Sequence, residues 1–69
     1  MTFGERIKEL RKSKNLTLAQ LADLTGLNTM TLSKIENDHH KPSALTVGKL
    51  ASIFGQEYEE LWKLATKKE

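Results

Sequence analysis

The stretch from Leu16 to Asn37 constrains the fold more than any other part of this chain. It contains two short helical patterns that flank Gly26. Gly26 is expected to end the first pattern, because glycine readily adopts the left-handed backbone of a sharp turn. Asn28 can cap the second pattern, which carries small polar residues where a core helix would be apolar. The sequence therefore predicts two short helices joined by a tight turn, with the second one facing outward.

The N-terminal segment predicts another helix ahead of this pair. Residues 2–5 have the sequence of a capping box, in which a threonine and a glutamate three residues later satisfy two free backbone amides. Phe3, Ile7 and Leu10 then recur at the spacing of one apolar helix face. We expect this helix to end near Lys14, where the apolar pattern stops.

Capping signals also mark the second and third helices. Residues 17–20 repeat the capping-box pattern and open the second helix. Its expected inner face consists of Leu18, Leu21 and Ala22. The third helix, which starts after Asn28, is expected to bury Leu32 and Ile35. The sequence shows no sustained strand-like alternation, so the helical interpretation extends to the whole chain.

The C-terminal half predicts two more helices. A polar loop from Asn37 to Pro42 leads to Ser43, which can cap a fourth helix. Gly55 is expected to end that helix. The fifth helix is expected to bury Tyr58, Leu61, Trp62 and Leu64. We therefore expect an all-α, five-helix fold and a single domain over residues 1–69, with a charged tail from about residue 65.

Size and composition limit what can stabilise such a fold. The chain has 69 residues and no cysteine, so neither a disulfide nor a thiolate metal site can reinforce its small core. The formal net charge is +2, with basic residues concentrated in the first helix, which gives weak support for a nucleic-acid partner. No apolar run approaches the length that spans a bilayer, and no secretory pattern opens the chain, so we expect a cytoplasmic protein.

The outward-facing third helix has the properties of a helix that enters the major groove of DNA. That groove is about 12 Å wide and admits one α-helix. Polar or flexible side chains near the start of such a helix can reach base edges, and the amides at helix starts can bind phosphates. The expected base contacts are Asn28, Thr29, Met30, Ser33 and Lys34. On the opposite side, Leu32 and Ile35 are expected to anchor the helix to the core.

Several short motifs match one family of regulators. They are Ile7–Arg11, Leu16–Thr17, Leu21–Ala22, Thr25–Leu27, Leu32–Asn37, Lys41–Ser43, Leu50–Ala51 and Phe54–Gly55. On these residues, the chain from Phe3 to Leu61 resembles the lambda-repressor-like DNA-binding domains of the Cro/CI type. These domains are also called the xenobiotic-response-element family of bacterial and phage regulators. The resemblance implies a five-helix domain that contains a helix-turn-helix and binds DNA.

The resemblance also implies roles for matching residues. The positions at which the family contacts the DNA backbone are Thr17, Leu18, Asn37, His39, His40 and Lys41. Arg11 and Glu36 match a partly buried ion pair that joins the first helix to the end of the recognition helix. Such a pair fixes geometry more than it adds net stability. The family's base-reading positions correspond to the residues from Thr29 to Lys34.

Four positions depart from the family pattern. Leu18 replaces a glutamine that braces a recognition side chain in many relatives, and Asp38 replaces a common glycine. Aspartate is less suited than glycine to a left-handed backbone. Gly48 replaces a bulky apolar residue that is usual in the family, and Gln56 replaces a small apolar residue. These departures affect local packing rather than the expected fold.

Several of these residues allow two interpretations. Met30 can contact a thymine methyl group or fold back as a flexible core residue. Lys34 can pair with guanine or lie near a phosphate. His39 and His40 suggest a metal site, but adjacent histidines lack a helical ligand spacing and no further ligands complete the set. We therefore expect neither a metal nor a cofactor, and the absence of a nucleophile–base pair argues against an enzyme.

The combined expectation is a sequence-specific transcriptional regulator. It is expected to act as a repressor that binds a palindromic operator in double-stranded DNA as a homodimer. The expected dimer surface is the fifth helix around Tyr58, Leu61 and Trp62. The alternative is an antitoxin-type module that binds a protein partner as well as DNA, and a purely structural helical domain is a third interpretation.

Overall fold

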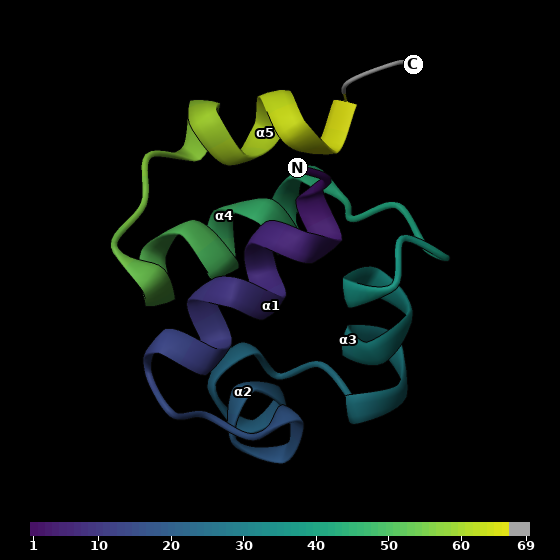
Figure 1. Ribbon diagram of the computed structural model, residues 1–69, viewed down its shortest axis with the longest axis vertical. Helices are drawn as coiled ribbons and strands as arrows, with labels where there is room; N and C mark the ends of the chain where they lie inside the picture. The colour runs from purple at the N-terminus through teal and green to yellow at the C-terminus, as the bar shows by residue number, and fades with distance from the viewer. Residues whose placement is uncertain (67–69) are drawn as a thin grey trace.

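Five α-helices make up most of residues 1–66, the part of the chain that the computed structural model describes (Figure 1). They are α1 (Phe3–Ser13), α2 (Leu18–Thr25), α3 (Thr29–Glu36), α4 (Ala44–Phe54) and α5 (Tyr58–Thr66). This part of the chain contains no strand. The expectation of an all-α, five-helix fold is therefore confirmed. The end of the expected charged tail, Lys67 to Glu69, lies outside the described residues.

The first four helices begin at the side chains that the capping patterns predict. The hydroxyl groups of Thr2 and Thr17 accept a hydrogen bond from the backbone N–H three residues on, which belongs to Glu5 or Gln20. The side chain of that residue in turn accepts a hydrogen bond from the backbone N–H of the threonine. The Thr2 N–H lies 2.9 Å from Oε1 of Glu5, and this bond holds the pKa of that carboxyl below its usual range. Asn28 and Ser43 cap α3 and α4 through a side-chain oxygen. Local hydrogen bonds thus define where these helices start.

A set of short contacts fixes the turn between α2 and α3. Gly26 has a φ of 74°, the left-handed conformation that its position in the sequence predicts. The buried Thr25 hydroxyl donates to the Leu21 carbonyl at 2.9 Å and accepts from the Leu27 N–H at 3.2 Å. Lys49 of α4 donates to the Thr25 carbonyl at 3.2 Å. These bonds restrict how far α3 can move relative to α2.

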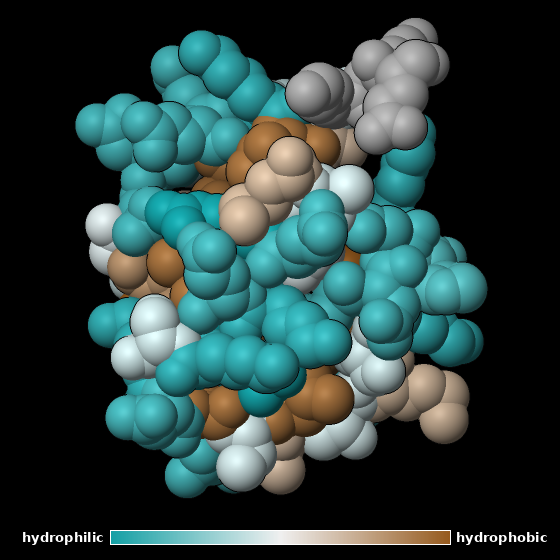
Figure 2. Space-filling model, viewed as in Figure 1, coloured by the Kyte–Doolittle hydropathy of each residue, from teal (hydrophilic) through white to brown (hydrophobic). Residues whose placement is uncertain are grey.

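The helices enclose one cluster of buried apolar residues. Its members are Phe3, Ile7, Leu10, Leu21, Ala22, Leu32, Ile35, Val47, Leu50, Ala51, Phe54 and Leu61. Every helix contributes to the cluster, and in Figure 1 α1 runs through the middle with α5 above, α2 below and α3 to the right. The surface in the same view is mostly hydrophilic, with smaller hydrophobic areas at the upper centre, the left edge and the bottom (Figure 2). Burial of this cluster is the main driving force for folding.

The expectation that the fifth helix buries Tyr58 is wrong. Tyr58 is 39% exposed, and Trp62 and Leu64 are only half-buried, whereas Leu61 lies in the core. The Tyr58 ring stacks on Trp62, with the ring centroids 5.9 Å apart. It also lies over Gly48 of α4, where an added Cβ would be 3.8 Å from the ring. Tyr58 therefore packs on the surface of α4, because Gly48 leaves no side chain there.

Gly48→Ala is expected to stabilise the domain by about 0.5–1 kcal/mol. Alanine has a higher helix propensity than glycine, and its Cβ would make an ordinary contact with the Tyr58 ring. Urea unfolding followed by circular dichroism measures the change. Gly26→Ala is the matched control, because a φ of 74° is strained for alanine and the variant should lose about 1 kcal/mol. If Gly48→Ala instead destabilised the domain, the space between residue 48 and the Tyr58 ring would be too small for a methyl group.

Candidate nucleic-acid interface

Helix α3 has a buried face and an exposed face. Leu32 and Ile35 are 0% and 2% exposed and hold the helix against the core. Thr29, Met30 and Lys34 lie on the outside, with Met30 67% exposed. This exposure excludes the alternative that Met30 fills the core. The surface over α3, at the right in Figure 2, is hydrophilic in its upper part and has neutral and hydrophobic areas lower down, so it offers a partner both polar and apolar groups.

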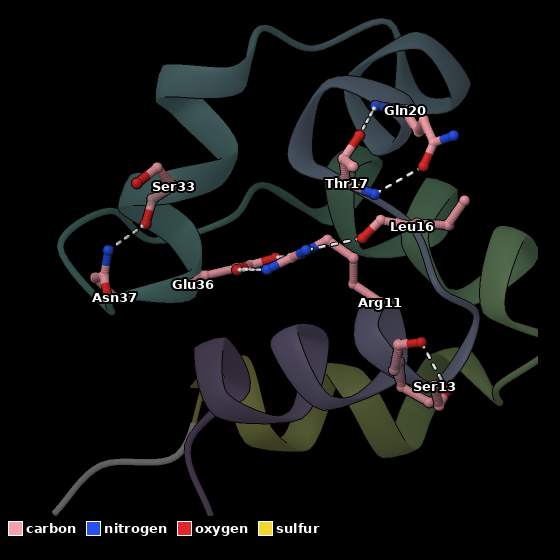
Figure 3. A network of polar contacts seen from close by, with 9 residues as sticks. Arg11, Ser13, Leu16, Thr17, Gln20, Ser33, Glu36 and Asn37 are labelled. Carbon is pink, nitrogen blue, oxygen red and sulfur yellow. Dashed lines mark hydrogen bonds and ion pairs between the residues drawn. The ribbon is translucent and has the colours of Figure 1, made fainter.

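Polar side chains at the two ends of α3 already take part in hydrogen bonds. Asn28 Oδ1 accepts from the Thr31 N–H at 2.7 Å, which leaves Nδ2 as the group of Asn28 most available to a partner. Asn37 Nδ2 donates to the Ser33 carbonyl at 2.9 Å (Figure 3). Ser33 itself is half-buried, and Asn28 and Asn37 are exposed. Both asparagines therefore have a defined orientation before any partner binds.

Backbone amides at the starts of α2 and α3 are available to bind an anion. In α3 the cap satisfies only the third amide, so the N–H groups of Thr29 and Met30 have no partner within residues 1–66. In α2 the same holds for the N–H groups of Leu18 and Ala19. Unbonded amides and the positive end of a helix dipole favour a phosphate at such a position.

The other residues expected to contact the DNA backbone lie at the start of α2 and after α3. Thr17 is exposed, and its hydroxyl keeps a hydrogen to donate because the cap uses Oγ1 as an acceptor. Leu18 is half-buried and packs against the core, so only its backbone N–H can reach a phosphate. His39, His40 and Lys41 are exposed in the loop before α4.

The structure contains the ion pair between Arg11 and Glu36 that the resemblance implies. Arg11 Nε lies 2.7 Å from Oε2 of Glu36, and a second guanidinium nitrogen lies 3.1 Å from Oε1. The third nitrogen donates to the Leu16 carbonyl at 2.8 Å. The two side chains are only 12% and 4% exposed. In Figure 3 the pair lies between Thr17 and Asn37, so it links the two segments expected to contact the DNA backbone.

A second attachment of α3, made by Asp38, was not predicted from the sequence. Its carboxylate accepts from the Gly4 N–H at 3.0 Å and from the Thr2 hydroxyl at 2.6 Å. The available signal was an aspartate at a position where the family often has glycine, and Asp38 indeed has a φ of 59°. The end of α3 is therefore fixed to α1 both here and at the ion pair.

His39 and His40 are not part of a larger set of metal-ligating side chains among the described residues. Among the described residues, no group of three or more histidine, cysteine, aspartate or glutamate side chains could hold a metal ion. Both histidines remain candidates for phosphate contacts.

In the same part of the chain, none of the helices combines the length and the apolar character needed to cross a membrane.

Comparison with known sequences identifies regulators with the same pattern. A family model described as a helix-turn-helix domain matches residues 4–67. The chain is 41% identical over 64 residues to the uncharacterized HTH-type transcriptional regulator RghRB of Bacillus subtilis, covering 91% of this chain and 46% of that protein. It is 42% identical over 55 residues to the immunity repressor protein of Bacillus phage phi105, covering 80% and 38%. The chain thus spans less than half the length of these relatives.

Two solved structures share the fold. The restriction-modification controller protein C.AhdI from Aeromonas hydrophila superposes with a TM-score of 0.78 and 36% identity, over 86% of this chain and 89% of that one. The master regulator for biofilm formation SinR, solved in complex with DNA, gives a TM-score of 0.80 and 31% identity, over 88% and 98%. These proteins are regulators rather than enzymes, and they confirm the resemblance inferred from the sequence.

Glu36→Gln is expected to lower the free energy of unfolding by about 2–3 kcal/mol, because it leaves the Arg11 guanidinium, on a side chain only 12% exposed, without a counter-charge. Glu9→Gln is the matched control. Glu9 pairs with Arg6 at the surface, where the side chains are 53% and 31% exposed, so its loss should cost less than about 1 kcal/mol. Urea unfolding measures both variants, and equal losses would contradict a structural role for the buried pair.

Proposed function

This chain belongs to the helix-turn-helix domain family, and we propose that it binds double-stranded DNA sequence-specifically and represses transcription. The observation that carries the proposal is the exposed polar face of α3 opposite the buried Leu32 and Ile35. Among its relatives, the phage protein and RghR of Bacillus subtilis are both named repressors. The bacterial and phage sources of these relatives support a protein of similar origin that acts in the cytoplasm.

The outward face of α3 supplies the proposed base contacts. Thr29 and Ser33 offer hydroxyl groups, and the exposed Met30 offers an apolar side chain to a thymine methyl group. Asn28 can donate through Nδ2. Lys34 is exposed and can donate either to guanine O6 and N7 or to a phosphate. Sequence preference would arise from this set of side chains.

The proposed backbone contacts come from the segments before and after α3. At the start of α2 they are the Thr17 hydroxyl and the Leu18 N–H. After α3 they are Asn37 and the exposed loop from His39 to Lys41. Phosphate contacts supply much of the affinity of such proteins and release counterions. Binding should therefore weaken steeply as the salt concentration rises.

A homodimer on a palindromic operator fits the size of the molecule. Two recognition helices in successive major grooves on one face of DNA are about 34 Å apart. The longest extent of the Cα positions is 30 Å, which is close to this spacing, so two copies can meet if each turns a side next to α3 toward the other. A two-fold dimer would then match an inverted repeat in the operator.

An exposed apolar groove between α2 and α4 supports a contact with another protein chain. Leu24 and Leu45 are 57% and 71% exposed and line this groove together with Gly48 and Ile53. The fifth helix, expected from the sequence to be the dimer surface, offers the exposed Tyr58 and the half-buried Trp62 to such a contact, whereas Leu61 is only 1% exposed and belongs to the core. A second copy of this chain is the proposed occupant. A different protein, as in an antitoxin-type module, is the alternative.

Selection of bound duplexes from a random-sequence pool at two salt concentrations tests the proposed function. We expect enrichment of an inverted repeat with half-sites about one helical turn apart, and much weaker binding at the higher salt concentration. Salt-sensitive binding without enrichment, together with co-purification of a second protein, would favour the antitoxin-type module. If no duplex binds in a salt-sensitive way, the proposed function is wrong.

Lys34→Ala distinguishes a base contact from a backbone contact. If Lys34 reads guanine, the variant should lose about 1–3 kcal/mol of binding free energy on the selected duplex and less on duplexes that lack this base pair. Fluorescence anisotropy measures the affinities. Lys63→Ala removes a lysine from α5 and serves as the control, for which we expect little change. Equal losses for Lys34→Ala on every duplex would assign Lys34 to a phosphate.

A further inference from the structure

The residue after the C-cap of α3 is an aspartate in a conformation that favours glycine. Asp38 has a φ of 59°, in the left-handed region that costs a residue with a Cβ more than it costs glycine. Such a conformation persists where the surrounding contacts compensate for its cost. The contacts of Asp38 therefore indicate what this residue does that a glycine could not.

Two hydrogen bonds to the start of α1 provide the compensation. Asp38 Oδ1 accepts from the Gly4 N–H at 3.0 Å, and Oδ2 accepts from the Thr2 hydroxyl at 2.6 Å, across 34 and 36 positions of sequence. The Gly4 N–H is one of the amides that the start of a helix leaves without an intrahelical partner. A carboxylate at this end of α1 also interacts favourably with the helix dipole. We refer to Thr2, Gly4 and Asp38 as the Asp38 clasp.

Gly4 allows the two helix ends to approach closely. A Cβ at this position would lie 2.5 Å from the carbonyl oxygens of Ile35 and Glu36, and 2.8 Å from Asp38 Oδ1. These distances are shorter than a carbon–oxygen contact permits, so any side chain at residue 4 would push α1 away from α3. Gly4 thus permits the close approach of α1 and α3 at which the Asp38 carboxylate can bind the Gly4 N–H.

The Asp38 clasp lies directly before the loop that leads to α4. The His39 N–H donates to the Lys34 carbonyl at 2.8 Å, which continues the end of α3. Beyond it, within the residues that the structure covers, His40 and Lys41 make no backbone–backbone hydrogen bond. The side chains from His39 to Lys41 are all exposed. Asp38 is thus the residue next to this loop whose side chain is fixed to α1 by hydrogen bonds.

We propose that Asp38 is a positioning residue for DNA binding: through Thr2 and Gly4, it holds the loop from His39 to Lys41 where the side chains meet phosphates. This inference rests on the proposed function and adds a residue that does not itself touch DNA. A loop that is held in place before binding loses less conformational entropy on binding. Because phosphate contacts carry no direct sequence information, the clasp raises the affinity for all duplexes alike.

The negative charge of Asp38 makes the direction of the change in DNA affinity informative when its carboxylate is removed. If charge alone mattered, removal of a carboxylate beside a phosphate-binding loop would strengthen DNA binding. If Asp38 positions the loop, removal of the same carboxylate weakens DNA binding. The direction of the change in affinity therefore separates the two effects.

Asp38→Gly is the main test variant. Glycine adopts the left-handed conformation without strain, which offsets part of the lost hydrogen bonding and keeps the domain folded. We expect binding to weaken about two- to tenfold, both on the selected duplex and on a duplex of mixed sequence. Circular dichroism establishes the folded fraction at the temperature of the binding measurement. Asp38→Asn keeps an oxygen for the Gly4 N–H and should bind with intermediate affinity, which preserves the test if Asp38→Gly is only partly folded.

Lys41→Ala is measured in the wild-type and Asp38→Gly backgrounds. The factor by which it reduces DNA affinity would be the same in both backgrounds if Asp38→Gly only lowered stability. If Asp38 acts through the loop, Lys41→Ala should reduce affinity by a smaller factor when Asp38 is already absent. Additive effects would overturn the proposal. So would unchanged or tighter binding by folded Asp38→Gly while the wild-type protein binds DNA. If the wild-type protein binds no duplex in a salt-sensitive way, the proposed function fails, and this inference fails with it.

Discussion

The candidate DNA-binding surface depends on the hydrogen bonds that the Arg11 guanidinium makes. This guanidinium binds Glu36 at the end of α3 and the Leu16 carbonyl ahead of α2, so a single side chain joins three segments of the chain. A buried ion pair adds little net stability, because both charged groups lose their water. Its main effect here is geometric, since the start of α2 and the end of α3 cannot shift independently of α1.

Local interactions explain why so much of the fold could be predicted from the sequence. Thr17 and Asn28 cap helices through amides three residues away, and Gly26 ends α2 within the same short stretch. Such contacts appear as fixed spacings in the sequence. The exposed face of α3 was predictable for a related reason, because the burial of Leu32 and Ile35 follows the period of a helix.

Contacts between distant segments could not be predicted in this way. Tyr58 stays at the surface because Gly48 of another helix leaves room for its ring. Asp38 tolerates its left-handed backbone because Gly4 and Thr2, more than thirty positions earlier, bind its carboxylate. No local pattern encodes these pairings, since each depends on how the helices pack. The resemblance to known regulators supplied the one long-range pair that was anticipated, the ion pair of α1 with α3.

Amide chemical-shift changes on titration with the selected duplex test the central claim most directly: that α3, held in place by Arg11, presents its outward face to DNA bases. If the claim is correct, the largest changes fall between Asn28 and Lys34, with smaller changes at Thr17 and in the loop from His39 to Lys41. Large changes around Leu24 and Leu45 or along α5, with α3 unaffected, would contradict it.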